Sequence, residues 1–400
     1  MAVHAWIFDY GPSQIVFTTT VLSFSGNWGR QNYLDNYAGG GFQVTIKNNT
    51  NQVASFTRGT KIRILNVDGF TIWSGKITTI DYNDYPGDTG LSTATLHCID
   101  MISQSGKFTM KNMNYTAAQT CTQAAQTNAL FPTAPQITSS TAGDSTASGT
   151  ASAYNGTILN RLNTLNNTEK GLLSALSELV GFMARSQVSV YGTTVQLVRS
   201  TSNSARLTYT NIRRIGLGDN FMNQVTVNPE TVAAQLYDNT ASQTSYGISG
   251  YSVSTADSTT DQAAGLASWL GTMQGDPATL RFEIDFSDVS SNATAFTTYL
   301  VDTLYSLTPN VTIEYQAQGQ SLQTVACITE GGTFSGTPSE TNITVFLSPS
   351  TYYLYFVLNN YQYGILGGDG ITYDQPEIVY DENGWIYNDA NVEQGSRLGW

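Results

Sequence analysis

Short stretches in which apolar and polar residues alternate are the feature that most constrains the fold of this 400-residue chain. In one of them, Val44 and Ile46 lie on one side of an extended chain, while Gln43 and Thr45 lie on the other. Because the side chains of a β-strand alternate between two faces, this pattern predicts half-buried strands. Their close spacing, with intervening turns rich in Gly, Asp, Asn and Pro, predicts an antiparallel β-barrel over residues 1–110. The strands are expected at 15–24, 42–47, 60–67, 71–82 and 92–99.

Residues 111–214 differ in character, and they are expected to form an α+β domain. Within them, residues 136–157 consist mainly of Ser, Thr, Ala and Gly, and therefore predict an exposed loop with too little apolar surface to pack. Thr168 is a candidate N-cap for a helix whose apolar stripe follows i, i+4, i+7 spacing. The stripe comprises Leu172, Leu176, Leu179 and Met183, and strands are expected to follow at 186–191 and 195–199.

Strand-like runs return in the second half of the chain. They predict a second β-barrel built from residues 215–255 and 305–350, with residues 256–304 as an α+β insertion. The insertion is expected to contain a helix at 260–273 and a strand at 281–286. The expected fold class is therefore mainly β with α+β insertions, in which two antiparallel β-barrels are accompanied by smaller α+β domains.

Charge is distributed unevenly along the chain. Residues 1–214 hold 15 Lys and Arg against 10 Asp and Glu, a net charge of +5. Residues 215–400 hold 2 basic residues against 20 acidic ones, a net charge of −18, so that the two parts sum to −13. Since an acidic surface repels phosphate and offers few cations to displace counterions, we expect no specific binding of nucleic acid.

Cysteine usage and hydropathy exclude two further classes of protein. The cysteines Cys98, Cys121 and Cys327 are odd in number and far apart, so they predict small buried apolar residues and not a disulfide framework. The longest uninterrupted apolar run, at 352–358, covers seven positions, well short of the roughly 18 that a membrane helix needs. No membrane segment is therefore expected.

No constellation of residues predicts an enzyme. A nucleophilic triad needs a histidine, and only His4, at the terminus, and His97, in an alternating strand, are available. Glu283 and Asp285 share one face of a predicted strand, as a glycosidase pair would. Because Arg281 shares that face and the other face is apolar, we interpret the pair as the polar side of an amphipathic strand. No catalytic residue is predicted.

Metal and cofactor sites are equally without support in the sequence. Asp81, Asn83 and Gly87 lack the residue order and the later Glu of a calcium loop, and therefore indicate a turn. The glycine-rich stretches Gly39–Gly41 and Gly367–Gly370 lack the Lys and the strand-to-helix context of a phosphate loop. The sequence thus predicts no metal site, no cofactor-binding residue and no cofactor.

The last segment, residues 351–400, combines many aromatic residues with seven carboxylates and a single basic residue, Arg397. It has neither the two-residue period of a strand nor the 3.6-residue period of a helix, so it predicts no core of its own. Exposed rings are unfavourable in water, and we expect the segment to be an aromatic, acidic docking arm that binds a neighbour. Its expected anchors are Trp385, Leu398 and Trp400.

Three segments near the N-terminus carry a family resemblance. They are GRQNYLDNYAGGGFQVTIKNN at 29–49, TRGTKIRI at 57–64 and TIWSGKITTIDYNDYPG at 71–87. In this order and spacing they resemble the N-terminal domain of minor tail or baseplate hub proteins of long-tailed, siphovirus-like bacteriophages. Segments that are similar to the central and final parts of the same proteins occur at 223–227, 244–255, 263–270, 280–286, 340–350, 356–368 and 396–400.

The resemblance implies a structural protein at the distal end of the tail in the virion. It implies a homotrimeric ring that joins the tail tube to the host-recognition apparatus and lines or gates the DNA exit channel. The implied partners are further copies of the chain, distal tail or tail tube proteins, the tape measure protein, and tail fibre or receptor-binding proteins. Two alternatives stay open: a distal tail ring protein, which a hexamer would favour, and a receptor-binding or carbohydrate-binding tail protein, which the aromatic residues of the arm suggest.

Overall fold

The computed structural model describes residues 6–65, 71–100, 211–255, 259–287 and 310–349, apart from single positions, together with short pieces between 103 and 198. Residues 351–400, and with them Trp385, Leu398 and Trp400, lie outside the described residues, as do His4 and Cys121.

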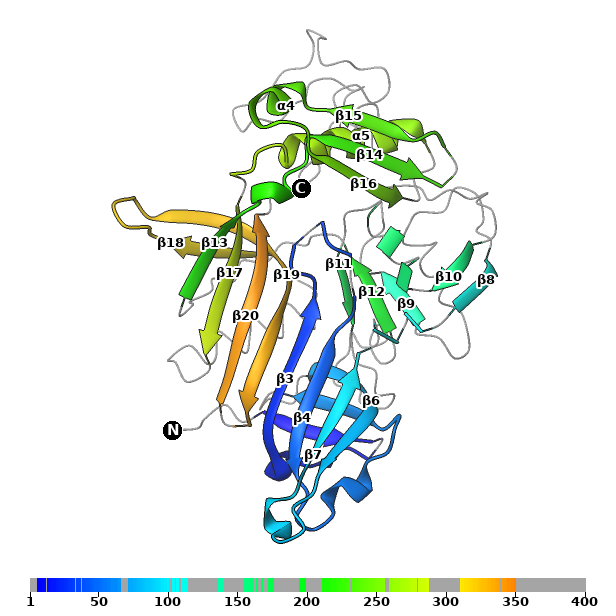
Figure 1. Ribbon diagram of the computed structural model, residues 1–400, viewed down its shortest axis with the longest axis vertical. Coiled ribbons are helices and arrows are strands. Elements are labelled where there is room, and N and C mark those ends of the chain that lie inside the picture. Colours follow the sequence, from blue (N-terminus) through cyan, green and yellow to red (C-terminus); the bar gives the residue numbers. More distant parts are fainter. Residues whose placement is uncertain are drawn as a thin grey trace, which may run out of the picture.

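A twelve-stranded, antiparallel sheet forms the body of the molecule, and the chain is mainly β, as predicted (Figure 1). Two groups of strands contribute to it, one from each end of the described chain. The first group comprises β1 (Ile7–Tyr10), β2 (Ile15–Val16), β3 (Val21–Gly29), β4 (Gly41–Lys47), β5 (Lys61–Leu65), β6 (Thr71–Asn83) and β7 (Thr93–Ile99). The second comprises β13 (Asn211–Gly216), β17 (Leu280–Ser287), β18 (Asn310–Tyr315), β19 (Gln323–Thr337) and β20 (Glu340–Pro349).

The order of strands in this sheet is β13-β17-β20-β19-β3-β4-β7-β6-β5-β1-β2, and β18 pairs with β19 beside this path. The long strand β19 therefore branches. On one side it pairs with β20 along its length, and on the other it pairs first with β18 and then, after a bulge, with β3. The strands of the first predicted barrel and the strands at 310–349 thus share one continuous sheet, which the sequence pattern did not indicate.

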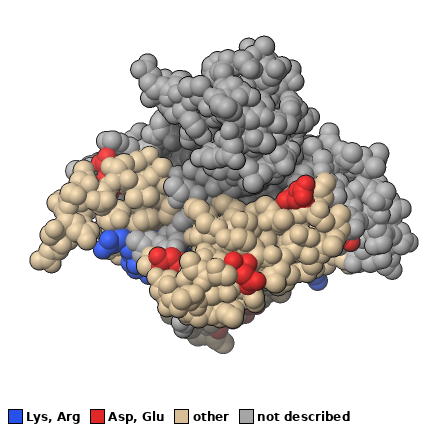
Figure 2. All heavy atoms as spheres, turned by 90° about the horizontal axis from the view of Figure 1, so that it is seen from above, with Lys and Arg blue, Asp and Glu red and all other residues tan. Residues whose placement is uncertain are grey.

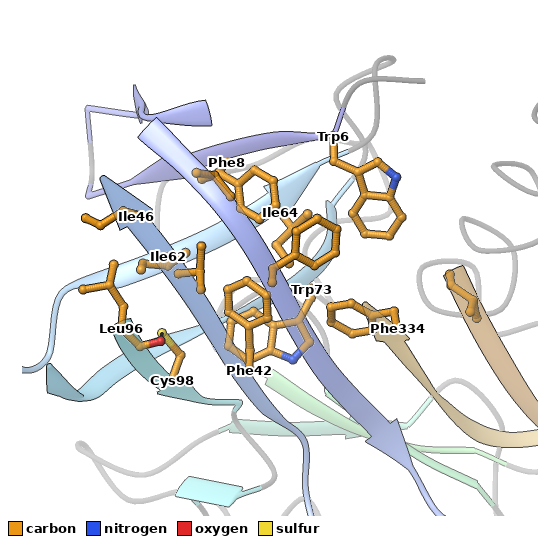
Figure 3. Close-up of a cluster of buried hydrophobic side chains, with 14 of the residues drawn as sticks. Trp6, Phe8, Phe42, Ile46, Ile62, Ile64, Trp73, Leu96, Cys98 and Phe334 are labelled. Carbon is orange, nitrogen blue, oxygen red and sulfur yellow. Dashed lines mark hydrogen bonds between the residues drawn. The ribbon is translucent and has the colours of Figure 1, made fainter. Parts of the chain in front are cut away.

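One hydrophobic cluster lies on a single side of this sheet and includes residues from both groups of strands. In the first group it combines aromatic rings with aliphatic side chains, and Phe8 and Phe42 are almost completely buried with their ring centroids 6.3 Å apart (Figure 3). Phe42 also packs on Trp73, with 4.9 Å between the ring centroids. Alternation in β4 and β7 explains this, because every second residue from Phe42 to Ile46 and from Ala94 to Cys98 is buried.

A smaller three-stranded sheet lies at one end of the molecule, at the top of Figure 1. It consists of β14 (Gln224–Pro229), β15 (Gln235–Asp238) and β16 (Gly250–Thr255), and it carries the helices α4 (Thr240–Tyr246) and α5 (Thr260–Met273). The helix predicted at 260–273 is confirmed, and it packs its buried residues Leu266 and Leu270 on β14 and β15. Of the described helices, none is both long and apolar enough to span a membrane.

Shorter elements complete the described chain. The strands β8 (Thr109–Met113) and β10 (Tyr154–Thr157) form one small sheet, and a second is formed by β9 (Gln136–Ser139), β11 (Leu172–Ala175) and β12 (Thr194–Val198). Four single-turn helices occur among the described residues: η1 (Thr18–Thr20), η2 (Gln52–Ser55), η3 (Thr89–Leu91) and η5 (Gly218–Asn220).

Three local predictions differ from this structure. The strand expected at 15–24 is interrupted by η1, since Phe8 donates its backbone N–H to Thr18 Oγ1 and Phe17 donates to the Phe8 carbonyl. The loop expected at 136–157 has strands at both ends, and its middle, 140–153, lies outside the described residues. The helix expected after Thr168 is wrong where it can be checked, because Leu172–Ala175 is the strand β11.

Strand pairing explains why residues 172–175 form a strand and not a helix. Leu172 and Leu173 lie opposite Val198 and Leu197 of β12, so apolar contacts across the sheet replace those along one helix face. A short apolar run fits both the two-residue period of a strand and the 3.6-residue period of a helix, and the partner strand decides between them. The rest of that predicted helix, including Leu176, Leu179 and Met183, lies outside the described residues.

The assignment of strands in the second half also differs from the prediction. Residues 215–255 contribute the separate sheet of β14–β16, whereas β17, expected in the insertion, pairs with β13 and β20. The cause is the shared core: Phe282 lies opposite Leu347 and Ile284 opposite Val345, and all four are buried in the same cluster. Alternation indicates that a strand is half-buried, but it does not indicate which sheet the strand joins.

Candidate assembly surface

The junction between the two groups of strands is held by a fully buried ion pair. Arg30, just after β3, directs its Nε to Glu330 Oε2 at 2.8 Å, and neither side chain is exposed to solvent. The two backbones also meet here, since the Arg30 N–H donates to the Glu330 carbonyl at 3.0 Å. A second donor of the same guanidinium, Nη1, lies 3.3 Å from the Asp35 carbonyl. Residues 300 positions apart are thereby fixed to each other.

Glycine is needed at this junction because the strands approach closely. A Cβ atom on Gly331 would lie 2.4 Å from the Trp28 carbonyl oxygen, which is closer than atoms can pack. Gly29, directly opposite in the pairing, has a φ of +69°, a conformation that side chains disfavour. The β-bulge between Thr329 and Gly331 turns the chain at the same point. The junction is therefore specified locally by glycine on both strands.

Phe334 extends the core of the second group into that of the first. It belongs to β19, is 3% exposed, and stacks on Phe42 and Trp6 with ring centroids 6.0 and 6.1 Å apart. In Figure 3 its ring lies beside Trp73 and Phe42, at the border of the two groups. The two parts of the sheet therefore bury their apolar surface together.

The opposite face of the sheet is a broad polar surface, which we call the polar face. It carries mainly hydroxyl and amide side chains that lie opposite one another across neighbouring strands. Thr45 and Thr95, for example, are joined by a hydrogen bond of 3.2 Å. The paired positions are Ser25 with Ser335, Asn27 with Thr333, Gln43 with His97, Thr45 with Thr95, and Thr333 with Thr344.

Charges on the polar face are mostly paired. In the second group, Arg213 of β13 lies 2.8 Å from Glu283, and Arg281 lies 3.7 Å from the same carboxylate. Asp285 accepts hydrogen bonds from Asn211 Nδ2 at 3.1 Å and from Thr344 Oγ1 at 2.7 Å. The two carboxylates considered as a glycosidase pair are thus held by side chains of the sheet itself, in keeping with an amphipathic strand.

The remaining candidate for catalysis is His97, which lies on the polar face of β7. Its Nε2 is 2.7 Å from Asp81 Oδ2, and the Asp81 side chain is 71% exposed. The neighbouring Cys98 points to the opposite side and is buried in the core. Within the described part of the chain, no group of three or more His, Cys, Asp or Glu side chains could hold a metal ion.

Three strands of the large sheet have one side without a partner strand among the described residues: β2, β13 and β18. The last two approach each other across the second group. Arg214 of β13 lies over the ring of Tyr315 of β18, 5.2 Å from the ring centroid, and Phe282 packs on the same ring at 5.7 Å. Contacts between side chains close this part of the core, and no described strand pairs with the outer side of β13 or β18.

Sequence reasoning did not predict the buried ion pair of Arg30 and Glu330. Arg30 lies within the segment that carries the family resemblance, but Glu330 is remote in sequence and no local pattern links the two. The pair of glycines at 331 and 332, inside an otherwise strand-like run, is the one local signal of a close backbone approach.

The described residues define a β-sheet protein with a broad polar face and two joined groups of strands. No family model and no curated protein matches the sequence. Solved structures do match. The tail protein from Neisseria meningitidis MC58 superposes with a TM-score of 0.58 at 11% identity, covering 88% of this chain and 98% of that one.

A second match is the 43 kDa tail protein of prophage MuSo2 from Shewanella oneidensis, with a TM-score of 0.53 at 11% identity and the same coverage of both chains. At this identity the likeness is one of fold. The chain therefore has the fold of these two tail proteins, in agreement with the resemblance carried by its N-terminal segments.

Proposed function

We propose that this protein is a structural component of a phage tail tip, a baseplate hub or minor tail protein in the virion. The observation that carries the proposal is the single sheet made from both ends of the described chain, with its shared core and its polar face. The fold likeness to two tail proteins supports it across nearly the full length of both neighbours. In this role the protein is a scaffold and not an enzyme.

The proposed assembly is a homotrimer. Each chain contributes two groups of strands, so three chains supply six similar units that match a sixfold tail tube. In this proposal each group acts as one tube-like barrel, and the free edges of β13 and β18 receive strands or loops of the neighbouring chain. Tail tube or distal tail proteins would contact one side of the ring, and tail fibre or receptor-binding proteins the other.

The polar face is proposed to line the channel through which DNA and the tape measure protein pass. The described part of this face carries mainly hydroxyl and amide groups, and its Arg213 and Arg281 lie beside the two carboxylates Glu283 and Asp285. A channel wall that held DNA tightly would retard ejection, because counterion release stabilises such complexes. The net charge of −18 in residues 215–400 fits the same requirement.

Native mass spectrometry of the purified chain tests the oligomeric state. We expect a species three times the chain mass of 43.3 kDa. A hexamer would instead favour the alternative of a distal tail ring protein, and a stable monomer in assembled tails would contradict the ring.

The arm at residues 351–400 is proposed to dock on an adjacent tail protein through Trp385, Leu398 and Trp400. Deleting residues 370–400 is expected to leave the melting temperature of the sheet unchanged while tails fail to assemble. The substitution Trp385→Ala alone is the milder form of the test. Normal assembly of the truncated protein would contradict a docking role.

A further inference from the structure

A polar cavity of about 300 Å³ lies between the small sheet, the loop after β3 and the described helical residues Asn160, Asn163, Thr164 and Asn167. It has a size at the lower end of ligand pockets, which measure roughly 300–1,000 Å³. The polar face and the junction described above do not include it. Its lining residues are Asn36, Asn160, Asn163, Thr164, Asn167, Tyr251, Ser252, Val253 and Ser254.

One wall of the cavity is the edge of a strand. Residues 251–254 of β16 are consecutive, and all four line the cavity. Since successive side chains of a strand point to opposite faces, a cavity that meets four in a row must lie along the edge of the strand. β16 pairs with β14 on its other side, and no described strand pairs with this edge. The cavity therefore lies where the next strand of the small sheet would lie.

The opposite wall presents a row of amides. Asn160, Asn163, Thr164 and Asn167 are helical and follow the spacing i, i+3, i+4, i+7, which brings them to one face of a helix. Asn167 Nδ2 donates to Asn36 Oδ1 at 3.1 Å, which ties this helical piece to the loop after β3. Asparagine amides both donate and accept hydrogen bonds, as the peptide groups of a polypeptide backbone do.

The described residues of the lining are uncharged. None of the nine residues is acidic or basic. Burial and the negative charge of the nearby Asp35 raise the pKa of Tyr251, while Arg30 lowers it by a smaller amount. The Tyr251 hydroxyl therefore stays protonated at neutral pH. Figure 2, seen from this end of the molecule, shows that most of the described surface carries no charge. A charged side chain would lose hydration here, and none of the nine lining residues would offer it an opposite charge.

We propose that this cavity binds an extended peptide segment with small, uncharged side chains, which adds to the free edge of β16 and is held from the other side by the asparagine row. Strand addition gives backbone hydrogen bonds on one side, and the amides supply them on the other. The limited volume favours Gly, Ala, Ser and Thr over large side chains. A sugar would match the polar lining as well, but it would make no use of the two-residue repeat along the strand edge.

The test uses the full-length protein and a dye-labelled synthetic peptide of alternating Thr, Ser and Ala with blocked ends. Binding is followed by fluorescence polarisation and by protection of the β16 amides from hydrogen exchange. Two variants remove the site: Asn163→Leu deletes one amide at similar volume, and Ser254→Trp fills the cavity from an exposed position. Their controls are Asn83→Leu and Ser321→Trp at exposed positions near turns of the large sheet.

We expect the peptide to bind the unmodified protein and both controls, and to bind each site variant at least about tenfold more weakly. A peptide with proline at every second position, which cannot donate backbone hydrogen bonds there, is expected to fail. The proposal is overturned if the labelled peptide does not bind, if proline peptides bind equally well, or if neither site variant weakens binding. Binding of glucose or N-acetylglucosamine that is lost in both site variants, in place of peptide binding, would identify a sugar site and also overturn it.

Discussion

The two groups of strands in the large sheet differ in the core side chains and ion pairs that stabilise them. The first group has a core that combines aromatic rings with aliphatic side chains and buries an ion pair, in which Arg63 binds Asp9 through two hydrogen bonds of 3.0 and 2.7 Å. The second group has a core of Ile284, Val345 and Leu347, and its ion pairs lie on the polar face, where the Arg213 side chain is 53% exposed.

This difference indicates a division of roles. Large rings and a buried bidentate pair favour one fixed packing for the first group. The second group has the half-exposed Arg213 on its polar face, and no described strand pairs with the outer side of β13 or β18, which suits a surface that meets other subunits. The junction at Arg30, Glu330 and Phe334 belongs to both groups. Substitutions there therefore test the difference between the groups most directly.

Breaking the buried pair at the junction is expected to have the largest effect. Glu330→Ala leaves the guanidinium of Arg30 buried without its carboxylate, and should lower the free energy of unfolding by about 3–5 kcal/mol. Chemical denaturation measures this loss. The double variant Arg30→Met with Glu330→Met removes both charges and should recover most of it. Equal losses in the single and double variants would show that the stability of the junction does not depend on the charges of the pair.

Phe334→Ala tests whether the two cores act as one. Removing this ring from the contact with Phe42 and Trp6 should lower the free energy of unfolding by about 3 kcal/mol. Because the ring packs on the first group, melting of both groups should shift together in a single transition. Two separated transitions in the unmodified protein would instead mean that the groups are independent domains.

Arg213→Ala probes the exposed pair of the second group. Glu283 still has Arg281 at 3.7 Å after this substitution, and the Arg213 side chain is 53% exposed in the unmodified protein. The free energy of unfolding should therefore fall by no more than about 1 kcal/mol. The residual effect should shrink further in high salt. A loss comparable to that of Glu330→Ala would remove the proposed contrast between the two groups.

Thiol labelling gives the smallest expected signal. Burial raises the pKa of Cys327 to about 12, so its thiol stays protonated at neutral pH, and Cys98 is also buried. Mass spectrometry after brief treatment with a thiol reagent should find neither residue modified in the folded protein and both modified in denaturant. Rapid labelling of Cys327 in the folded protein would indicate that the second core opens readily.

Local patterns predicted much of the fold. Alternation located β4, β6 and β7, and an apolar stripe located α5, because each element buries one face of its own sequence. Pairing between distant segments was not predictable in this way: nothing near Gly331 indicates that β3 is its neighbour. The same limit applies to the cavity, where the spacing of Asn160, Asn163 and Asn167 is visible in the sequence but the facing edge of β16 is not.

A three-dimensional reconstruction of the assembled tail tip by electron cryomicroscopy tests the central claim most directly. The account predicts three copies of this chain around the tail axis, with the polar face that carries Thr45, Thr95 and Ser335 turned toward the channel. Six copies in the ring, or a polar face turned outward with the channel lined by another protein, would contradict it.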